Sequence, residues 1–192
     1  VTPDHIEWHG SFEKYLKSKE RIFANQTADD YLIVNDLDPA LRVSAKKAAS
    51  LLIPFNSEKT LSEGASLADG TIQITLRGKT TTIGPRTCLK LKGQHNVENA
   101  LAAASAAVAM GVAPDIIRGV FESFEGVPHR LEPVGEFKGV TIINDSKATN
   151  PEATITALKA VYDRGKRTTI LIAGGRDKNT PLEEMAGWIL KT

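Results

Sequence analysis

The polar segment NDSKATNP (residues 144–151) contains several side chains that can bind a ligand. Asp145 can accept a hydrogen bond from a hydroxyl such as that of a ribose, while Lys147 and Thr149 can hold an anion. Asn150 followed by a proline is typical of a helix N-cap, so the segment also faces a helix N-terminus, which favours negative charge. An ordinary loop and cap would explain Asn150 alone, whereas the whole cluster indicates a ligand site.

A second segment of the same kind, LIAGGRDKN (residues 171–179), comes after the next predicted strand. Gly174 and Gly175 would let the backbone approach a ligand closely, and Lys178 supplies a cation. A tight turn between a strand and a helix would explain the glycines equally well. If the segment lies on a neighbouring strand of one sheet, it supports a site shared with Lys147.

Lys19 occupies an unusual position in the predicted helix over residues 12–23. At 100° per residue it falls on the same face as Phe12, Leu16 and Phe23. An unpaired ammonium on a buried face is costly, so Lys19 either extends to water or has a special partner. Both interpretations stay open, and lysines in such positions are functional candidates because burial shifts their pKa.

The N-terminal segment DHIEWHG places His5 and His9 four residues apart. Pro3 and Gly10 argue against a helix long enough to present both rings. The pattern is not that of a zinc site. One of these residues could bind a hard cation together with distant ligands, and ordinary surface polarity is the alternative.

The segment GQHNVENALAAASAA predicts the start of a closely packed helix that carries two amides at its beginning. We expect Asn96 to be the N-cap, with Asn99 one turn further on the same side, so that both amides could contact a planar ligand such as a purine. Capping explains Asn96 but leaves Asn99 unexplained. Arg130, in a predicted domain junction, could clamp a phosphate bidentately, and an ordinary salt bridge is the alternative.

The composition restricts the class of protein. A net charge of +1 without a basic block argues against a nucleic-acid-binding protein, and no apolar run or signal peptide predicts membrane insertion. The single Cys88 excludes an internal disulfide and fits a reducing, cytoplasmic compartment. The sequence does not contain the phosphate-binding motif G-x-x-x-x-G-K-[ST]. Because the chain begins with Val1 and its last residues give no obvious stop to a fold, we expect a piece of a longer protein.

The predicted elements would bring these residues together at one edge of a sheet. Alternation of strand and helix from residue 139 onward predicts a parallel α/β sheet, whose ligands bind beyond the carboxyl ends of the strands. Gly and Pro residues within 125–130 indicate a domain boundary. The predicted helices cover residues 12–23, 97–110, 114–125, 151–162 and 181–190. The predicted strands cover residues 30–35, 139–144 and 168–175, and shorter β runs lie within residues 71–92. Residues 45–52 could form either kind of element.

Five segments in consistent order resemble the Mur ligase family: DHIEWHGSFEKYLKSKERIF, GQHNVENALAAASAA, GVPHRLE, INDSKATNPEAT and LIAGGRDKN. Within the family, NDSKATNP looks like the string of the members that add D-glutamate to UDP-N-acetylmuramoyl-L-alanine. The resemblance covers nearly the whole chain and is least distinctive over residues 40–90. It implies an α/β fold in which residues 1–126 are the rear part of a P-loop-type ATPase domain and 127–192 are part of a Rossmann-like C-terminal domain.

The resemblance also implies an ATP-dependent acid–D-amino-acid ligase of peptidoglycan synthesis, monomeric when complete, that uses ATP and Mg²⁺. The P-loop, a UDP-binding domain and an upstream magnesium-binding glutamate would lie outside this chain, so we expect the chain alone to be inactive. For the metal, the resemblance implies that His5 is a magnesium ligand and that Lys19 is a carbamylated, catalytic lysine that also binds magnesium. The implied nucleotide-binding residues are Asn96, Asn99, Arg130 and Asp145. Lys147, Thr149 and Lys178 are implied to bind D-glutamate near the reacting centre, Lys147 and Lys178 as catalytic residues.

Two alternatives remain. One is another amide ligase of the same superfamily, such as a folylpolyglutamate synthetase-like protein, against which the string SKATNP argues. The other is a non-catalytic nucleotide-binding module that uses the turn at Gly174 and Gly175 as its ligand loop.

Overall fold

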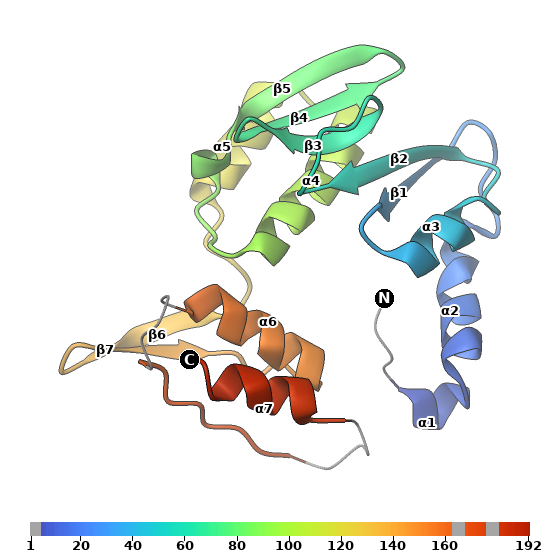
Figure 1. The fold of residues 1–192 in the computed structure, drawn as a ribbon. Helices are drawn as coiled ribbons and strands as arrows, with labels where there is room; N and C mark the ends of the chain where they lie inside the picture. The colour runs from blue at the N-terminus through green and yellow to red at the C-terminus, as the bar shows by residue number, and fades with distance from the viewer. Residues whose placement is uncertain (1–4, 163–167, 176–180) are drawn as a thin grey trace. The chain divides into compact units, whose positions relative to one another are not determined.

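A computed structural model describes residues 5–162, 168–175 and 181–192 of the chain (Figure 1). The residues divide into two compact units, which are described separately below. The first comprises Val1–Lys90 and Gln94–Phe124, and the second comprises Leu91–Gly93 and Glu125–Thr192. No helix in the described ranges is long and apolar enough to cross a membrane.

The first unit contains a five-stranded mixed sheet in which the strands follow one another in chain order. The first three strands are parallel neighbours and the last two are added in antiparallel fashion. The parallel part places the carboxyl ends of β1 and β2 at one edge, where open α/β sheets bind ligands. The strands are β1 (Tyr31–Asn35), β2 (Leu51–Asn56), β3 (Gly64–Ala68), β4 (Thr71–Leu76) and β5 (Lys79–Pro85).

Tight turns join the antiparallel strands. Asp69 and Gly70 have φ angles of 47° and 74°, and Arg77 and Gly78 have φ angles of 53° and 73°, as two-residue hairpin turns require. The β runs predicted on either side of Gly78 are therefore confirmed, and they pair as a hairpin. The β run predicted over residues 88–92 is wrong, because the chain leaves the sheet after β5 in a 3₁₀ turn at Arg86–Cys88.

Helices pack on this sheet and close the main core. In Figure 1, α4 (Gln94–Ala109) lies beside the sheet; it contacts β1, β2, β3 and β4, while α5 (Pro114–Ser123) packs on β5. The small residues of α4 permit the close approach expected from the sequence, since Ala100 and Ala104 are buried. Burial of each large aliphatic side chain contributes roughly 1.5–3 kcal/mol. The largest fully buried aliphatic residues are Ile53, Ile72, Ile74, Ile83, Val97 and Leu101.

The ends of α4 test two predictions. The helix begins at Gln94, so Asn96 lies within its first turn and the predicted N-cap role is wrong. At the other end Gly111 adopts a left-handed φ of 78°, which stops the helix close to its predicted end at residue 110. The next helix, α5, begins at Pro114 as predicted, and ends before Gly126 is reached.

The remaining helices of the first unit are short. The predicted helix over residues 12–23 is confirmed, with a final turn that tightens to 3₁₀ geometry. The sequence did not predict the helix between β1 and β2, which Asp38 caps by accepting hydrogen bonds from two backbone N–H groups. These elements are α1 (Ile6–His9), α2 (Phe12–Glu20), η1 (Arg21–Phe23) and α3 (Pro39–Ala45).

The second unit contains a two-stranded antiparallel sheet and two helices. The strands are β6 (Glu132–Phe137) and β7 (Val140–Asn144), joined by a Lys138–Gly139 turn with φ angles of 51° and 80°. The helices α6 (Pro151–Val161) and α7 (Glu183–Ile189) pack against each other.

The predicted strand over residues 168–175 is wrong, because this segment forms no β ladder in the described part of the chain. The N–H groups of Thr168 and Thr169 instead donate to the carbonyl of Thr192. The side chains of Ile170 and Ile172 are 86% and 94% exposed, respectively. An apolar extended segment becomes a strand only when another strand pairs with it, and here β7 pairs with β6 alone.

Candidate functional site

Two asparagines end the parallel strands at the carboxyl edge of the first sheet. Asn35 ends β1, and its Oδ1 accepts the N–H of Leu37 at 2.9 Å. Asn56 ends β2, and its Oδ1 accepts the N–H groups of Glu58 and Lys59 at 2.9 and 3.0 Å. Each amide closes a local turn and leaves its NH₂ group to bind another residue. The sequence analysis missed both asparagines, although each follows an apolar run directly.

Asp36 connects the loops that follow β1 and β2. Its carboxylate accepts from Asn56 Nδ2 at 2.9 Å and from Lys59 Nζ at 3.0 Å, and Arg42 Nε lies 3.5 Å away. The hydrogen bond from Asn56, followed by that from Lys59, holds the pKa of Asp36 below its ordinary value. These contacts hold the two loops at the carboxyl edge of the sheet in a fixed, charged network.

Helix α4 is attached to the same edge through Glu98. One carboxylate oxygen accepts from Asn35 Nδ2 at 3.1 Å, and the other accepts from Ser57 Oγ at 3.5 Å. Beside it, Asn99 Nδ2 donates to Asn96 Oδ1 at 3.4 Å, so the two amides lie together as the sequence predicted. Asn99 is exposed and Asn96 is half-buried. A pair of amides therefore lies at the start of α4, beside the carboxyl edge of the parallel strands.

Lys19 is exposed, and the apolar face on which the sequence placed it is only half-buried. Helix α2 has no buried residue, because its apolar side chains are only half covered. The ammonium group lies 5.2 Å from the centroid of the Tyr15 ring, a cation–π contact that leaves it accessible. The extension of Lys19 to water, left open by the sequence, is the arrangement observed.

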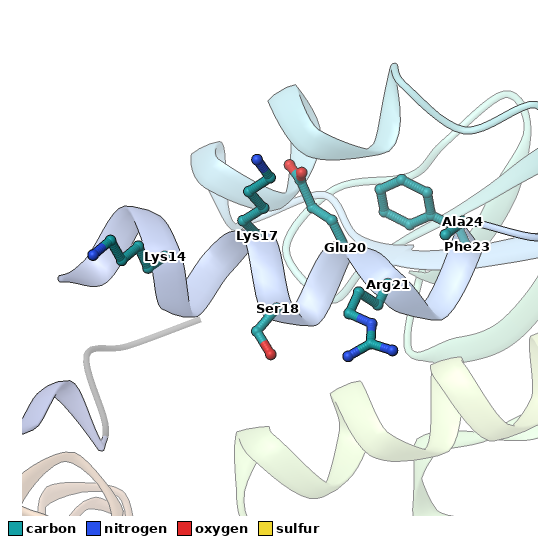
Figure 2. A pocket seen from close by; sticks show the side chains of 7 residues that line it. All are labelled: Lys14, Lys17, Ser18, Glu20, Arg21, Phe23 and Ala24. Atoms are coloured by element: carbon teal, nitrogen blue, oxygen red, sulfur yellow. The ribbon is translucent and has the colours of Figure 1, made fainter. Parts of the chain in front are cut away.

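A shallow hollow runs along α2 and η1 (Figure 2), and Lys19 is not among its lining residues. Glu20 in this hollow pairs with Lys47 at 2.5 Å, and this hydrogen bond lowers the pKa of Glu20. The basic side chains of the hollow point in different directions in Figure 2, so they do not form a common anion site. The lining residues are Lys14, Lys17, Ser18, Glu20, Arg21, Phe23 and Ala24.

His5 precedes α1 and is exposed, with a left-handed φ of 53°. The helix α1 has only four residues and Gly10 ends it, as the sequence predicted. Within the described ranges, no group of three or more His, Cys, Asp or Glu residues could hold a metal ion. The magnesium-binding roles of His5 and Lys19 stay a prediction.

The polar loop of the second unit is hydrogen-bonded to the segment that carries Arg130. Asp145 Oδ1 accepts the N–H of Leu131 at 3.0 Å, and the N–H of Lys147 donates to the carbonyl of His129 at 3.1 Å. His129 and Leu131 both adopt positive φ angles, 68° and 44°, which are uncommon for residues other than glycine. These contacts place Arg130 beside the loop that contains Asp145 and Lys147.

The predicted ligand-binding side chains of the second unit differ in how far they are buried. Asp145 is half-buried, whereas Arg130, Lys147 and Thr149 are exposed within the described chain. Asn150 Oδ1 accepts the N–H of Ala153 at 2.8 Å, which confirms the predicted N-cap of α6. Three possible ligand-binding side chains thus extend from a backbone fixed by hydrogen bonds and a helix cap.

A second polar network supports this loop and was not predicted. Asn144 Nδ2 lies 2.8 Å from His129 Nδ1 and donates to Glu132 Oε2 at 3.2 Å. The same Glu132 oxygen accepts the N–H of His129 at 2.8 Å, and Asn144 Oδ1 accepts the N–H of Ser146 at 3.1 Å. The one sequence feature that could have indicated this network is the position of Asn144, directly after an apolar strand.

The glycine turn of the second predicted segment is only partly described. Gly174 and Gly175 are exposed, and Gly175 has a φ of 143°. Lys178, predicted to bind substrate, lies outside the described residues.

The sequence matches the family model of the Mur ligase middle domain over residues 1–107 and that of the Mur ligase glutamate ligase domain over residues 129–191. The chain belongs to the Mur ligase family. This assignment confirms the predicted resemblance and the predicted α/β fold class. The two matched regions follow each other in the order that the sequence analysis expected.

Two curated relatives illustrate the similarity and carry the same name. A UDP-N-acetylmuramoylalanine–D-glutamate ligase of Thermoanaerobacter sp. strain X514 is 41% identical over 184 residues, which cover 96% of this chain and 40% of the relative. The enzyme of that name from Acidobacterium capsulatum is 44% identical over 182 residues, covering 94% of this chain and 39% of the relative. The chain therefore spans about 40% of the length of the relatives it matches.

Solved structures support the fold. The MurF protein of Acinetobacter baumannii matches with a TM-score of 0.61 and 22% identity, covering 82% of this chain and 35% of that protein. A pseudomurein peptide ligase type C of Methanothermus fervidus matches with a TM-score of 0.58 and 18% identity, covering 84% of this chain and 39% of that protein.

Proposed function

We propose that this chain is part of an ATP-dependent ligase that joins D-glutamate to UDP-N-acetylmuramoyl-L-alanine in peptidoglycan synthesis. The names of relatives 37–44% identical to the chain support this choice of substrates. The observation that carries the proposal is the pair of hydrogen bonds between the Arg130 segment and the loop of Asp145 and Lys147. Arg130, Asp145 and Lys147, which carry a guanidinium, a carboxylate and an ammonium group, thereby lie on adjoining segments near the capped N-terminus of α6.

The proposed reaction has two steps. ATP phosphorylates the alanyl carboxylate of the UDP-linked substrate and leaves as ADP. The amine of D-glutamate then attacks the acyl phosphate, an amide bond forms, and phosphate leaves. Holding the amine against the acyl carbon supplies much of the acceleration in such a reaction, because the encounter of the reactants has already taken place.

We propose nucleotide-binding roles for the amides at the start of α4 and for the segment of Arg130, each within its own unit. The exposed amide of Asn99 and the neighbouring amide of Asn96 can hydrogen-bond to the edge of an adenine. Arg130 can pair with phosphate oxygens, and Asp145 can accept from a ribose hydroxyl with the oxygen that does not bind Leu131. In this assignment, residues 1–126 belong to the ATP-binding domain and residues 127–192 to the glutamate-binding domain.

D-Glutamate is proposed to bind through Lys147, Thr149 and Lys178, whose side chains can hold carboxylates near the reacting centre. His5 and Lys19, the latter as a carbamate, would contribute ligands for Mg²⁺, with the remaining ligands outside the described residues. When bound, magnesium would neutralise phosphate charge and orient the phosphate oxygens. We further propose that the full-length ligase is a cytoplasmic monomer and that this chain alone is inactive.

A comparison of D- and L-glutamate with the full-length ligase tests the proposal. ADP formation in the presence of UDP-N-acetylmuramoyl-L-alanine should require D-glutamate. Lys147→Gln should raise the KM for D-glutamate at least about tenfold, since a charge-assisted hydrogen bond contributes about 1.5–3 kcal/mol. Lys138→Gln, at the exposed β6–β7 turn of the same unit, is the matched control and should leave this KM unchanged.

Each alternative predicts a different result. Turnover with L-glutamate in place of D-glutamate would indicate a ligase of the folylpolyglutamate synthetase type. Nucleotide binding without amide formation under any of these conditions would indicate a non-catalytic nucleotide-binding module.

A further inference from the structure

Glu98, in the first two turns of α4, hydrogen-bonds to residues at the carboxyl ends of both β1 and β2. Its two carboxylate oxygens bind different partners, Asn35 Nδ2 at the end of β1 and Ser57 Oγ just after β2. Ser57 is buried, and Asn35 and Glu98 are half-buried, so these hydrogen bonds are partly protected from water. Glu98 thus attaches the beginning of the helix to two neighbouring strands.

The hydrogen bonds of Glu98 hold the first turn of α4, the part of the helix that apolar packing constrains least. Leu101 and Ala104 are fully buried and fix the body of α4 against the sheet. The first turn of a helix is less constrained, because its N–H groups lack partners within the helix and helix ends fray. Only Val97 buries an apolar side chain in the turn that carries the two amides. A single aliphatic contact sets the rotation of that turn weakly. The hydrogen bond from Asn35 Nδ2 to Glu98 at 3.1 Å adds a polar restraint, and the longer contact with Ser57 Oγ at 3.5 Å supports it.

The amide pair depends on that rotation. Glu98 and Asn99 are adjacent in sequence, so a rotation that releases one side chain displaces the other. Asn96 and Asn99 are joined by a long hydrogen bond of 3.4 Å, which by itself holds the pair only loosely. We propose that Glu98 is a positioning residue that fixes the amides of Asn96 and Asn99 in place for the nucleotide base. This inference rests on the proposed nucleotide-binding role of these amides.

The proposal makes a chemical distinction between two substitutions. Glu98→Ala removes both acceptors and frees the first turn. Glu98→Gln can preserve both contacts, because its amide oxygen can accept from Asn35 and its NH₂ group can donate to the hydroxyl of Ser57. A role that depended on the negative charge itself would be lost in both variants.

The test measures ADP affinity by calorimetry, and KM for ATP and kcat by ADP release, in the full-length ligase. Glu98→Ala should weaken ADP binding and raise the KM for ATP about fivefold to tenfold, as expected for the loss of one to two hydrogen bonds. Both kcat and the KM for D-glutamate should stay within about twofold of the wild type, a range that corresponds to under about 0.5 kcal/mol. Glu98→Gln should restore ADP affinity to within about twofold of the wild-type value.

The matched control is Glu63→Ala. Glu63 also accepts two hydrogen bonds in the first unit, but its partners are the N–H groups of Arg77 and Gly78 in the turn between β4 and β5. This variant should leave ADP affinity unchanged. Unchanged ADP affinity in Glu98→Ala, or equal losses in Glu98→Ala and Glu63→Ala, would overturn the inference. If the wild-type protein binds ADP but does not ligate D-glutamate, the proposed reaction fails while the ADP affinities still decide the role of Glu98.

Discussion

Asn56 provides the sharpest test of how the carboxyl edge of the first sheet is held together. Its side chain is 1% exposed and makes three hydrogen bonds that join two loops. It accepts from the N–H groups of Glu58 and Lys59, and it donates to the carboxylate of Asp36. Asn56→Ala would remove all three hydrogen bonds without changing the backbone.

The size of the effect follows from these contacts. Each of the two neutral hydrogen bonds contributes about 0.5–1.5 kcal/mol, and the bond to the charged carboxylate about 1.5–3 kcal/mol. The sum lies between about 2.5 and 6 kcal/mol. Water can enter the space left by the Asn56 side chain and replace part of the lost hydrogen bonding. We therefore expect the free energy of unfolding to fall by about 3 kcal/mol.

Urea unfolding followed by circular dichroism measures this change, and hydrogen exchange in β1 and β2 assigns the transition to the first unit. With a denaturant slope of about 2 kcal/mol per molar, the midpoint should fall by about 1.5 M. Asn25→Ala, at an exposed asparagine of the same unit, should change the free energy of unfolding by less than about 0.5 kcal/mol. A midpoint for Asn56→Ala equal to that of Asn25→Ala would refute the reasoning.

Three further predictions concern other residues. The pKa of Asp36 is lower in the folded than in the unfolded chain, so its contribution to stability is present above its ordinary value of 3.8 and is lost as the pH falls through the folded value. Acid titrations should therefore show a shallower loss of stability below about pH 4 in Asp36→Asn than in the wild type, and parallel curves would contradict this. Gly64→Ala should destabilise strongly, because a Cβ there would lie 2.1 Å from the carbonyl oxygen of Pro54 at a φ of 107°, and an unchanged melting temperature would be inconsistent with that close approach. In the full-length ligase supplied with ¹³C-bicarbonate, NMR should detect a carbamate that Lys19→Arg abolishes, and its absence from the wild type would remove the proposed role of Lys19.

Local rules predicted much of the fold because the residues concerned determine backbone geometry directly. Asn150 caps α6 through a contact three residues away, and the left-handed φ of Gly111 ends α4. The prediction for Asn96 was wrong although the residue type was suitable, since α4 begins two residues earlier at Gln94. Capping propensity identifies a helix start only to within a few residues.

Predictions that depend on distant partners were less successful. The helical wheel placed Lys19 on the apolar face of its helix, but a wheel does not show whether another element covers that face. The strand predicted over 168–175 was wrong for a similar reason, because its apolar residues have no neighbouring strand in the described sheet. The contacts of Glu98 with Asn35 and Ser57 span 63 and 41 residues, and no local pattern marks them.

The candidate site residues were found by their chemistry and not by their distances. Arg130 and Asp145 were selected separately, and the hydrogen bond from Leu131 then placed their segments side by side. The supporting network of Asn144 and His129 was missed, because a polar residue after a strand can serve a turn as readily as a ligand.

In the proposed reaction, the full-length ligase activates the alanyl carboxylate as an acyl phosphate, which D-glutamate then attacks. Transfer of an oxygen isotope tests this most directly. The full-length ligase would be given UDP-N-acetylmuramoyl-L-alanine labelled with oxygen-18 in the alanyl carboxylate, together with ATP and D-glutamate. Mass spectrometry of the released phosphate should find one labelled oxygen for each amide formed. Unlabelled phosphate released at the rate of amide formation would contradict the account.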